Sequence, residues 1–190
     1  MSPEPLPPVY YRRLADRRAR FEQLVLPHMD AAYNLARWLT RNDQDARDVV
    51  QDAVLRAFRF LDGLRGEAKP WLLTLVRNSC MSWLKANRPS ELVAMDPDSA
   101  ELQRVEHQTP ETLALNALDR RLLNEALAAL PACFREALIL REMEDLAYKD
   151  IARITDVPIG TVMSRLARGR RLLADSMRAI SRASTARVRE

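Results

Sequence analysis

The chain has 190 residues, which is enough for one large or two small domains, and 47% of them are apolar. Its four glycines and 6% aromatic residues, set among many Ala, Leu and Arg, favour helices and argue against a sheet protein. The formal net charge of +4 modestly favours an anionic partner such as nucleic acid. We therefore expect an all-α protein.

Several kinds of site are not indicated. Cys80 and Cys133 lie far apart and outside any C-x-x-C motif, so we expect two small core residues rather than a disulfide or a zinc site. His28 and His107 have no neighbours at ligand spacing, so no metal or cofactor is expected. No apolar run is long enough for a membrane span, and the first residues do not resemble a signal peptide, so we expect a cytoplasmic protein.

The chain begins with residues 1–16, which are proline-rich and then basic, and we expect a loose arm there. From Arg20 to Thr40 apolar residues keep helical spacing, with a kink or join at Pro27. The break at 41–43 interrupts this pattern and supplies a cap for the next helix.

The stretch from Asp43 to Leu61 predicts a helix with two different faces. One face is apolar and belongs to the core: Ala46, Val49, Val50, Ala53, Val54, Ala57 and Leu61. The other face carries polar residues at i, i+3 and i+4, followed by two bases: Asp48, Gln51, Asp52, Arg56 and Arg59. This second face is either an ordinary solvated surface with internal ion pairs or a surface that binds a partner.

Two glycines and Pro70 then mark a loop, and a third helix is predicted from Pro70 to Ala86. Three helices would make the first domain, 17–88. The segment 89–112 follows, with three prolines and no sustained periodicity. Between Glu91 and Glu111 it has six acidic residues against the single base Arg104. We expect a flexible acidic linker, and a plain solvated tether explains it as well as any specific role does.

A second domain, 113–180, has a helical pattern that breaks at Pro131, and a further helix is predicted from Cys133 to Met143. The stretch 146–174 then forms two amphipathic helices around a tight corner, which is the pattern of a helix-turn-helix. Pro158 suits the first turn of a helix, so the second of these helices is predicted to begin at about Pro158 or Ile159. Asp156 occupies the turn position where glycine is common, and Asp tolerates the left-handed conformation better than most residues.

The second helix of this motif has a polar face suited to the DNA major groove. Its members lie at i, i+3, i+4 and i+7: Thr161, Ser164, Arg165 and Arg168. Arg can bridge guanine O6 and N7, and Ser or Thr can contact bases or phosphates. Lys149, Arg170 and Arg171 are better placed for phosphates, and residues 181–190 form a basic tail. The alternative is a helical hairpin with solvated arginines.

With both ends in view, the chain resembles the extracytoplasmic-function (ECF) subfamily of bacterial sigma factors from about Phe21 to Met177. The resemblance rests on four motifs in the family's order: D-A-R-D-V-V-Q-D-A-V-L-R-A-F-R, R-G-E-A-K-P-W-L-L-T-L-V-R-N, L-P-x-x-F-R-E-A-L-I-L-R and P-I-G-T-V-M-S-R-L-A-R-G-R. It implies that 17–88 is sigma region 2 and 113–180 is sigma region 4.

The resemblance also implies partners and sites. RNA polymerase core would be bound at the clamp helices of its largest subunit and the flap of its second-largest subunit. The residues implied at the clamp helices are Asp48, Gln51, Asp52 and Arg56. The loop from Leu61 to Pro70 and the following helix would recognise and open the minus-10 element, through Arg65, Lys69, Trp71, Asn78, Lys85 and Arg88. The minus-35 element would be recognised by Lys149, Thr161, Ser164, Arg165, Arg168 and Arg171.

An anti-sigma factor would hold such a protein inactive by covering both DNA-binding domains. Trp71 and Trp83 also fit the core, because tryptophans in apolar register are commonly packed inside.

The alternative function is a two-domain helix-turn-helix regulator, which would bind operators without polymerase, usually as a dimer. An enzyme is not indicated, because the sequence has neither a glycine-rich phosphate loop nor a Ser or Cys with a nearby His-Asp pattern.

Overall fold

A computed structural model describes the backbone of residues 8–89 and 115–187 and the side chains of 12–89 and 122–180. The N-terminal half contains α1 (Pro8–Leu24), α2 (Met29–Thr40), α3 (Asp43–Phe60) and α4 (Ala68–Asn87). The C-terminal half contains α6 (Leu115–Ala129), α7 (Ala132–Leu138), α8 (Tyr148–Thr155) and α9 (Ile159–Arg187). Short helical turns are η1 (Leu26–His28), η2 (Leu61–Gly63) and the π-helical η3 (Ile139–Met143). These ranges contain no strand, which confirms the all-α prediction.

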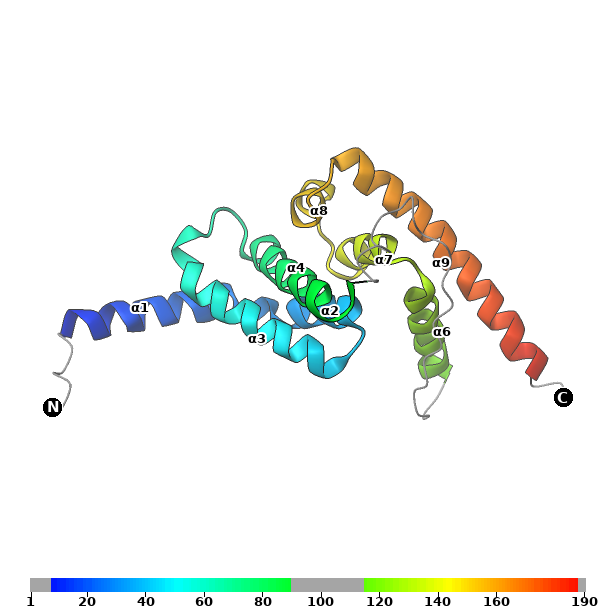
Figure 1. Ribbon diagram of the computed structural model, residues 1–190, viewed down its shortest axis with the longest axis horizontal. Coiled ribbons are helices and arrows are strands. Elements are labelled where there is room, and N and C mark those ends of the chain that lie inside the picture. Colours follow the sequence, from blue (N-terminus) through cyan, green and yellow to red (C-terminus); the bar gives the residue numbers. More distant parts are fainter. Residues whose placement is uncertain (1–7, 90–114, 188–190) are drawn as a thin grey trace.

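Helices α2, α3 and α4 pack against one another, and α1 extends away from them (Figure 1). The expected cap is confirmed, because the Asn42 side chain accepts hydrogen bonds from the backbone N–H groups of Gln44 at 2.8 Å and Asp45 at 3.0 Å. The join expected at Pro27 is the short turn η1 between α1 and α2. The linker expected over 89–112 lies outside the described residues, except for Pro89.

The prediction of a loose arm through residue 16 is wrong for residues 8–16, which belong to helix α1. Arg17 anchors this helix, because its guanidinium donates to the carbonyls of Phe58 at 2.8 Å and Arg59 at 2.6 Å. These carbonyls lie at the C-terminal end of α3, where a cation is favourable. Phe21 adds an edge-on ring contact with Phe58 at 5.3 Å between centroids. Residues 1–7 lie outside the described range.

In the C-terminal half, the helix expected from Cys133 to Met143 is α7 continued by the π-helical turn η3. Gly169 lets α9 lie close to α7, since a Cβ there would be 3.3 Å from the side chains of Leu138 and Phe134. Both cysteines are buried, as expected.

The helix-turn-helix is confirmed as α8, a turn and α9. Asp156 takes the left-handed conformation, with φ 54° and ψ 48°, and Val157 N–H donates to the Ala152 carbonyl at 3.1 Å. The second helix begins at Ile159, directly after Pro158. It continues as helix to Arg187, so the segment expected as a basic tail is helical over most of its length.

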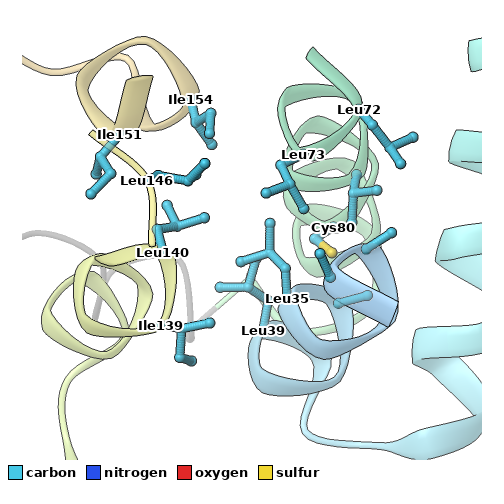
Figure 2. Packing of buried hydrophobic residues seen from close by; sticks show 14 of the residues in the cluster. Leu35, Leu39, Leu72, Leu73, Cys80, Ile139, Leu140, Leu146, Ile151 and Ile154 are labelled. Atoms are coloured by element: carbon cyan, nitrogen blue, oxygen red, sulfur yellow. The ribbon is translucent and has the colours of Figure 1, made fainter. Parts of the chain in front are cut away.

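The two halves also pack against each other, which the sequence did not indicate. Helix α4 contacts α8, and α2 contacts α7. Buried apolar side chains from both halves form one cluster. Figure 2 shows its two sides, with Leu140, Leu146 and Ile154 facing Leu35, Leu39 and Leu73. The two DNA-binding halves expected from the sequence therefore share an apolar interface.

Candidate protein and DNA interfaces

The polar face expected on α3 is present as a continuous exposed surface, which we call the α3 ridge. Its members are Gln44, Leu55 and the predicted residues, all of them exposed: Asp48, Gln51, Asp52, Arg56 and Arg59. Asp52 is engaged, because its Oδ2 accepts from Ser79 Oγ at 3.1 Å and pairs with Arg56 Nε at 2.8 Å. Asp48 accepts only a long 3.3 Å bond from Gln44 in the described part of the chain. Asp48 and Gln51 therefore present the more accessible polar groups.

Leu55 is a ridge residue that sequence reasoning missed. It is 61% exposed and lies two turns beyond Asp48, on the same side of α3. A single exposed Leu is ordinary on a protein surface, and on this face it adds apolar area that a protein partner can bury. The signal was available in the spacing, because Leu55 falls outside the apolar face that the sequence defined.

The loop before α4 turns at Gly66, whose φ is +76°. The next set of candidates shares one side of α4 at a spacing of seven residues: Trp71, Asn78 and Lys85. Asn78, Lys85 and Arg65 in the loop are exposed. Trp71 is half-buried and packs on the core, as does Trp83, so the core interpretation describes much of both side chains.

The other two minus-10 candidates are held by protein groups. Arg88 stacks over the Trp83 ring at 5.3 Å and donates to the Thr40 carbonyl at 3.2 Å. Lys69 Nζ lies 2.9 Å from Glu144 Oε2 and 2.8 Å from the Glu144 carbonyl oxygen. Because Glu144 follows η3, Lys69 connects the two halves of the protein.

Most of the minus-35 candidates lie on the exposed side of α9, and Lys149 lies on the neighbouring helix α8. Ser164, Arg168, Arg171 and Lys149 are exposed, and Thr161 is half-buried. Ser164 Oγ donates to the Thr161 carbonyl at 3.0 Å. The Arg168 guanidinium lies 5.4 Å from the centroid of the Phe134 ring. Arg170, which the sequence placed near phosphates, instead pairs with Glu142 at 2.7 Å.

Arg165 lies differently from the rest of its predicted set. It is half-buried, and its Nε is buried with no hydrogen-bond partner among the described residues. Its charge acts on Glu136 and Cys133 of α7, lowering the pKa of both groups against the larger raising effect of their burial. The structure therefore turns Arg165 toward α7 rather than fully outward.

Two exposed apolar residues at the start of α9 were not singled out from the sequence. Ile159 is 50% exposed and Met163 is 54% exposed, one turn apart. Met163 is the direct neighbour of Ser164. In a helix that enters the major groove, such side chains can contact the methyl groups of thymine.

A buried ion pair joins the halves beneath these surfaces. Arg77 Nε, on α4, lies 2.7 Å from Glu136 Oε1, on α7, and the two side chains are 14% and 0% exposed. Burial raises the pKa of Glu136, although Arg77, Arg165 and Arg135 each act to lower it. The nearby Cys80 thiol has a pKa of about 12, chiefly because it is buried.

Comparisons with known proteins show the family of this chain. The family model of Sigma-70 region 2 matches residues 24–89, and that of Sigma-70, region 4, matches residues 120–173. The ECF RNA polymerase sigma-E factor of Haemophilus influenzae is 33% identical over 151 residues, which are 75% of this chain and 79% of that protein. The chain belongs to the ECF subfamily of RNA polymerase sigma factors. This sigma factor is also 32% identical over 175 residues to the RNA polymerase sigma-H factor of Pseudomonas aeruginosa, covering 88% of the chain and 90% of that protein.

Solved structures share the fold of this sigma factor. The sigma factor RpoE of Bartonella quintana, solved in complex with the anti-sigma factor NepR, matches with a TM-score of 0.66 and 29% identity, over 83% of this chain and 96% of that one. CnrH, solved with the cytosolic domain of CnrY, matches with a TM-score of 0.59 and 22% identity, over 84% and 88% of the two chains, which shows a common fold. Within the described ranges, no helix of this sigma factor is long and apolar enough to cross a membrane.

Proposed function

We propose that this sigma factor binds the clamp helices of core RNA polymerase through the α3 ridge. The observation that carries the proposal is the ridge itself, in which Asp48 and Gln51 flank the exposed Leu55 on a single helix face. Protein–protein contacts commonly have an apolar centre with a polar rim, and Leu55 with its polar neighbours can supply both. Asp52 and Arg56 contribute less, because they already pair with each other.

The loop 64–67 and the exposed side of α4 are the proposed minus-10 surface. Asn78 offers amide groups, Lys85 and Arg65 offer charge, and the half-exposed Trp71 offers a ring on which an unstacked base can stack. All four lie in the part of the chain matched by Sigma-70 region 2.

The proposed minus-35 surface is the exposed side of α9 with Lys149. Arg168 is the candidate for a bidentate guanine contact, and Arg171 and Lys149 suit phosphates. Met163 adds an apolar contact with a thymine methyl group. Arg165 belongs to this surface only if it turns away from α7.

The protein acts as a transcription initiation factor, and we assign it no catalytic step of its own. We place it in the cytoplasm, where polymerase and promoter DNA are found. Control by an anti-sigma factor is supported by the likeness to RpoE of Bartonella quintana, which was solved bound to one.

In vitro transcription with core polymerase and a genomic promoter library tests the proposal. We expect initiation from a defined subset of promoters. A parallel gel-shift assay addresses the alternative, a two-domain regulator that binds operators by itself. A sigma factor binds its promoters strongly only when core polymerase is added. Tight, sequence-specific binding as a dimer without polymerase, with no RNA made, would favour the regulator.

A further inference from the structure

Helix α1 has a basic surface that neither the core nor the proposed sites use. Its N-terminal part extends beyond the packed helices α2, α3 and α4 (Figure 1). Between Arg12 and Arg20 the sequence has five arginines and a single acid, Asp16. Arg12 and Arg13 are exposed, and among residues 12–89 and 122–180 neither guanidinium has an ion pair or a hydrogen-bond partner. These two cations are therefore available to an anionic ligand.

The C-terminal part of α1 is held beside the proposed minus-10 surface. Arg17, which bonds to the last carbonyls of α3, also has its Nη1 3.4 Å from Asp62 Oδ2. Arg20 Nη1 lies 3.6 Å from the other oxygen of the same carboxylate. Asp62 belongs to η2, which leads directly into the loop 64–67. The orientation of α1 relative to this loop is therefore fixed by two arginines, while Arg12 and Arg13 lie farther out along the helix.

The composition of this surface suits phosphate better than a protein partner. A protein partner needs apolar area to bury, and Leu14 is the only exposed large apolar side chain among residues 12–24. An arginine guanidinium can donate two parallel N–H groups to phosphate oxygens. At 1.5 Å per residue, residues 8–16 reach about 13 Å beyond Arg17. That length corresponds to about four phosphates of one DNA strand.

We propose that Arg12 and Arg13 bind the phosphate backbone of the promoter DNA that flanks the minus-10 element. The contact adds affinity without recognising sequence, because phosphates are alike at every position. The inference rests on the proposed function and extends the DNA-binding surface to a segment outside the Sigma-70 region 2 match, which begins at residue 24.

The test uses the full-length protein assembled with core polymerase. Arg12→Ala/Arg13→Ala removes both cations and keeps good helix formers at exposed positions. Arg12→Lys/Arg13→Lys keeps the charge. Arg18→Ala is the matched control, because Arg18 lies on a different side of α1 and pairs with Glu22 at 2.7 Å.

Each holoenzyme is titrated with duplex minus-10 probes taken from a promoter found in the transcription assay. One probe is limited to the element, and two others are lengthened on its upstream or its downstream side. Titrations at several salt concentrations give the slope of the logarithm of the binding constant against the logarithm of salt concentration. Affinity of each variant for core polymerase is measured separately, without DNA.

We expect the wild type to gain more affinity than Arg12→Ala/Arg13→Ala when the probe is lengthened on one side, and that side locates the contact. Loss of two phosphate contacts should make the salt slope shallower by about 1.8. The advantage of the wild type should accordingly shrink roughly tenfold between about 50 and 200 mM salt. The lysine variant and Arg18→Ala should keep the wild-type slope.

Equal salt slopes for the wild type and Arg12→Ala/Arg13→Ala on every probe would overturn the inference. A loss of affinity for core polymerase, with unchanged DNA binding by the assembled holoenzyme, would assign the two arginines to a protein contact and overturn it as well. A wild-type holoenzyme that initiates from no promoter would instead refute the proposed function, so the two failures are distinguishable.

Discussion

Glu136 Oε1 on α7 lies 2.7 Å from Arg77 Nε on α4, so a fully buried carboxylate of the C-terminal half meets a cation of the N-terminal half. Leaving either charge without its partner in this buried position would cost free energy. Removal of one partner of a buried pair is far more costly than replacement of both, because the remaining charge has lost its compensation.

Replacement of Arg77 by Met should therefore destabilise the protein strongly. We expect a loss of about 3–5 kcal/mol in the free energy of unfolding, measured by urea denaturation. The double variant Arg77→Met/Glu136→Leu should recover most of that loss. Arg37→Met is the matched control, because the Arg37–Asp43 pair has the same 2.7 Å separation but is exposed, and it should cost under about 1 kcal/mol. Equal losses for Arg37→Met and Arg77→Met would contradict the buried pairing.

The Glu136 carboxyl should also make stability depend on pH. Its ordinary pKa is 4.5, and burial raises it in the folded protein against the opposing effects of Arg77, Arg165 and Arg135. The folded state therefore binds this proton more tightly than the unfolded state does. Its stabilising contribution is complete below pH 4.5 and is lost as the pH rises through the raised pKa.

The difference in unfolding free energy between the wild type and Glu136→Gln should accordingly shrink as the pH rises above 4.5. Asp43 offers a comparison of opposite sign, because the hydrogen bond from Arg37 lowers its pKa. The difference between the wild type and Asp43→Asn should shrink as the pH falls below 3.8. Urea titrations at a series of pH values measure both. If the difference in unfolding free energy between the wild type and Glu136→Gln grew as the pH rose, the raised pKa of Glu136 would be contradicted.

Charge reversal at Asp48 should weaken polymerase binding without unfolding the sigma factor. Asp48 is exposed and makes only a long hydrogen bond to Gln44, so the helix does not depend on it. A like charge placed against a complementary surface costs several kcal/mol, so Asp48→Lys should bind core at least about tenfold more weakly. Asp175→Lys makes the same charge change on α9 and should bind normally. Pull-down with core polymerase and circular dichroism check the two expectations, and a loss of helicity would count against the assignment.

Met163 should recognise a thymine methyl group within the minus-35 element. Replacing that thymine by uracil removes one methyl group, worth about 0.8 kcal/mol or roughly fourfold in affinity when buried. The polymerase holoenzyme with wild-type sigma should therefore bind the uracil promoter roughly fourfold more weakly than the thymine promoter. A holoenzyme with Met163→Ala should bind both promoters alike. If each thymine of the element can be replaced without effect on the wild type, Met163 makes no such contact.

Gly169 should not accept a larger residue. A Cβ at this position would already be 3.3 Å from Leu138 and Phe134, so Gly169→Val overpacks the α7–α9 contact and should cost about 1–3 kcal/mol. Gly160, in the same helix, has nothing within 4 Å of such a Cβ. Gly160→Ala should stabilise the helix by up to about 1 kcal/mol. The melting temperatures of the two variants are compared with that of the wild type. A rise for both variants would refute the close approach of α9 to α7 at Gly169.

The elements themselves could be predicted because each depends on local pattern. The helical spacing of apolar residues predicted the two helices of the helix-turn-helix, and the tolerance of Asp156 for a positive φ allowed the turn between them. Helix α1 was missed because its anchor, Arg17, bonds to carbonyls at the end of α3. That partner lies 41 residues away in sequence and leaves no local signal.

The exposed parts of the candidate sites were predictable for the same reason. Asp48 and Ser164 were assigned to solvent-facing sides by helical spacing alone. The inward turn of Arg165 and the pairing of Lys69 were not predictable, because both depend on contact between segments whose pairing no periodicity records. An arginine in amphipathic register looks the same in sequence whether it faces solvent or a buried glutamate.

The shared core has a consequence for building chimeric sigma factors. Exchange of one DNA-recognising half between relatives is attractive because each half recognises its own promoter element. In this protein a transplanted C-terminal half would have to bring a glutamate for Arg77 and apolar side chains that fit Leu35, Leu39 and Leu73. A hybrid made without this match would leave Arg77 buried without its carboxylate partner and would pack the apolar interface poorly.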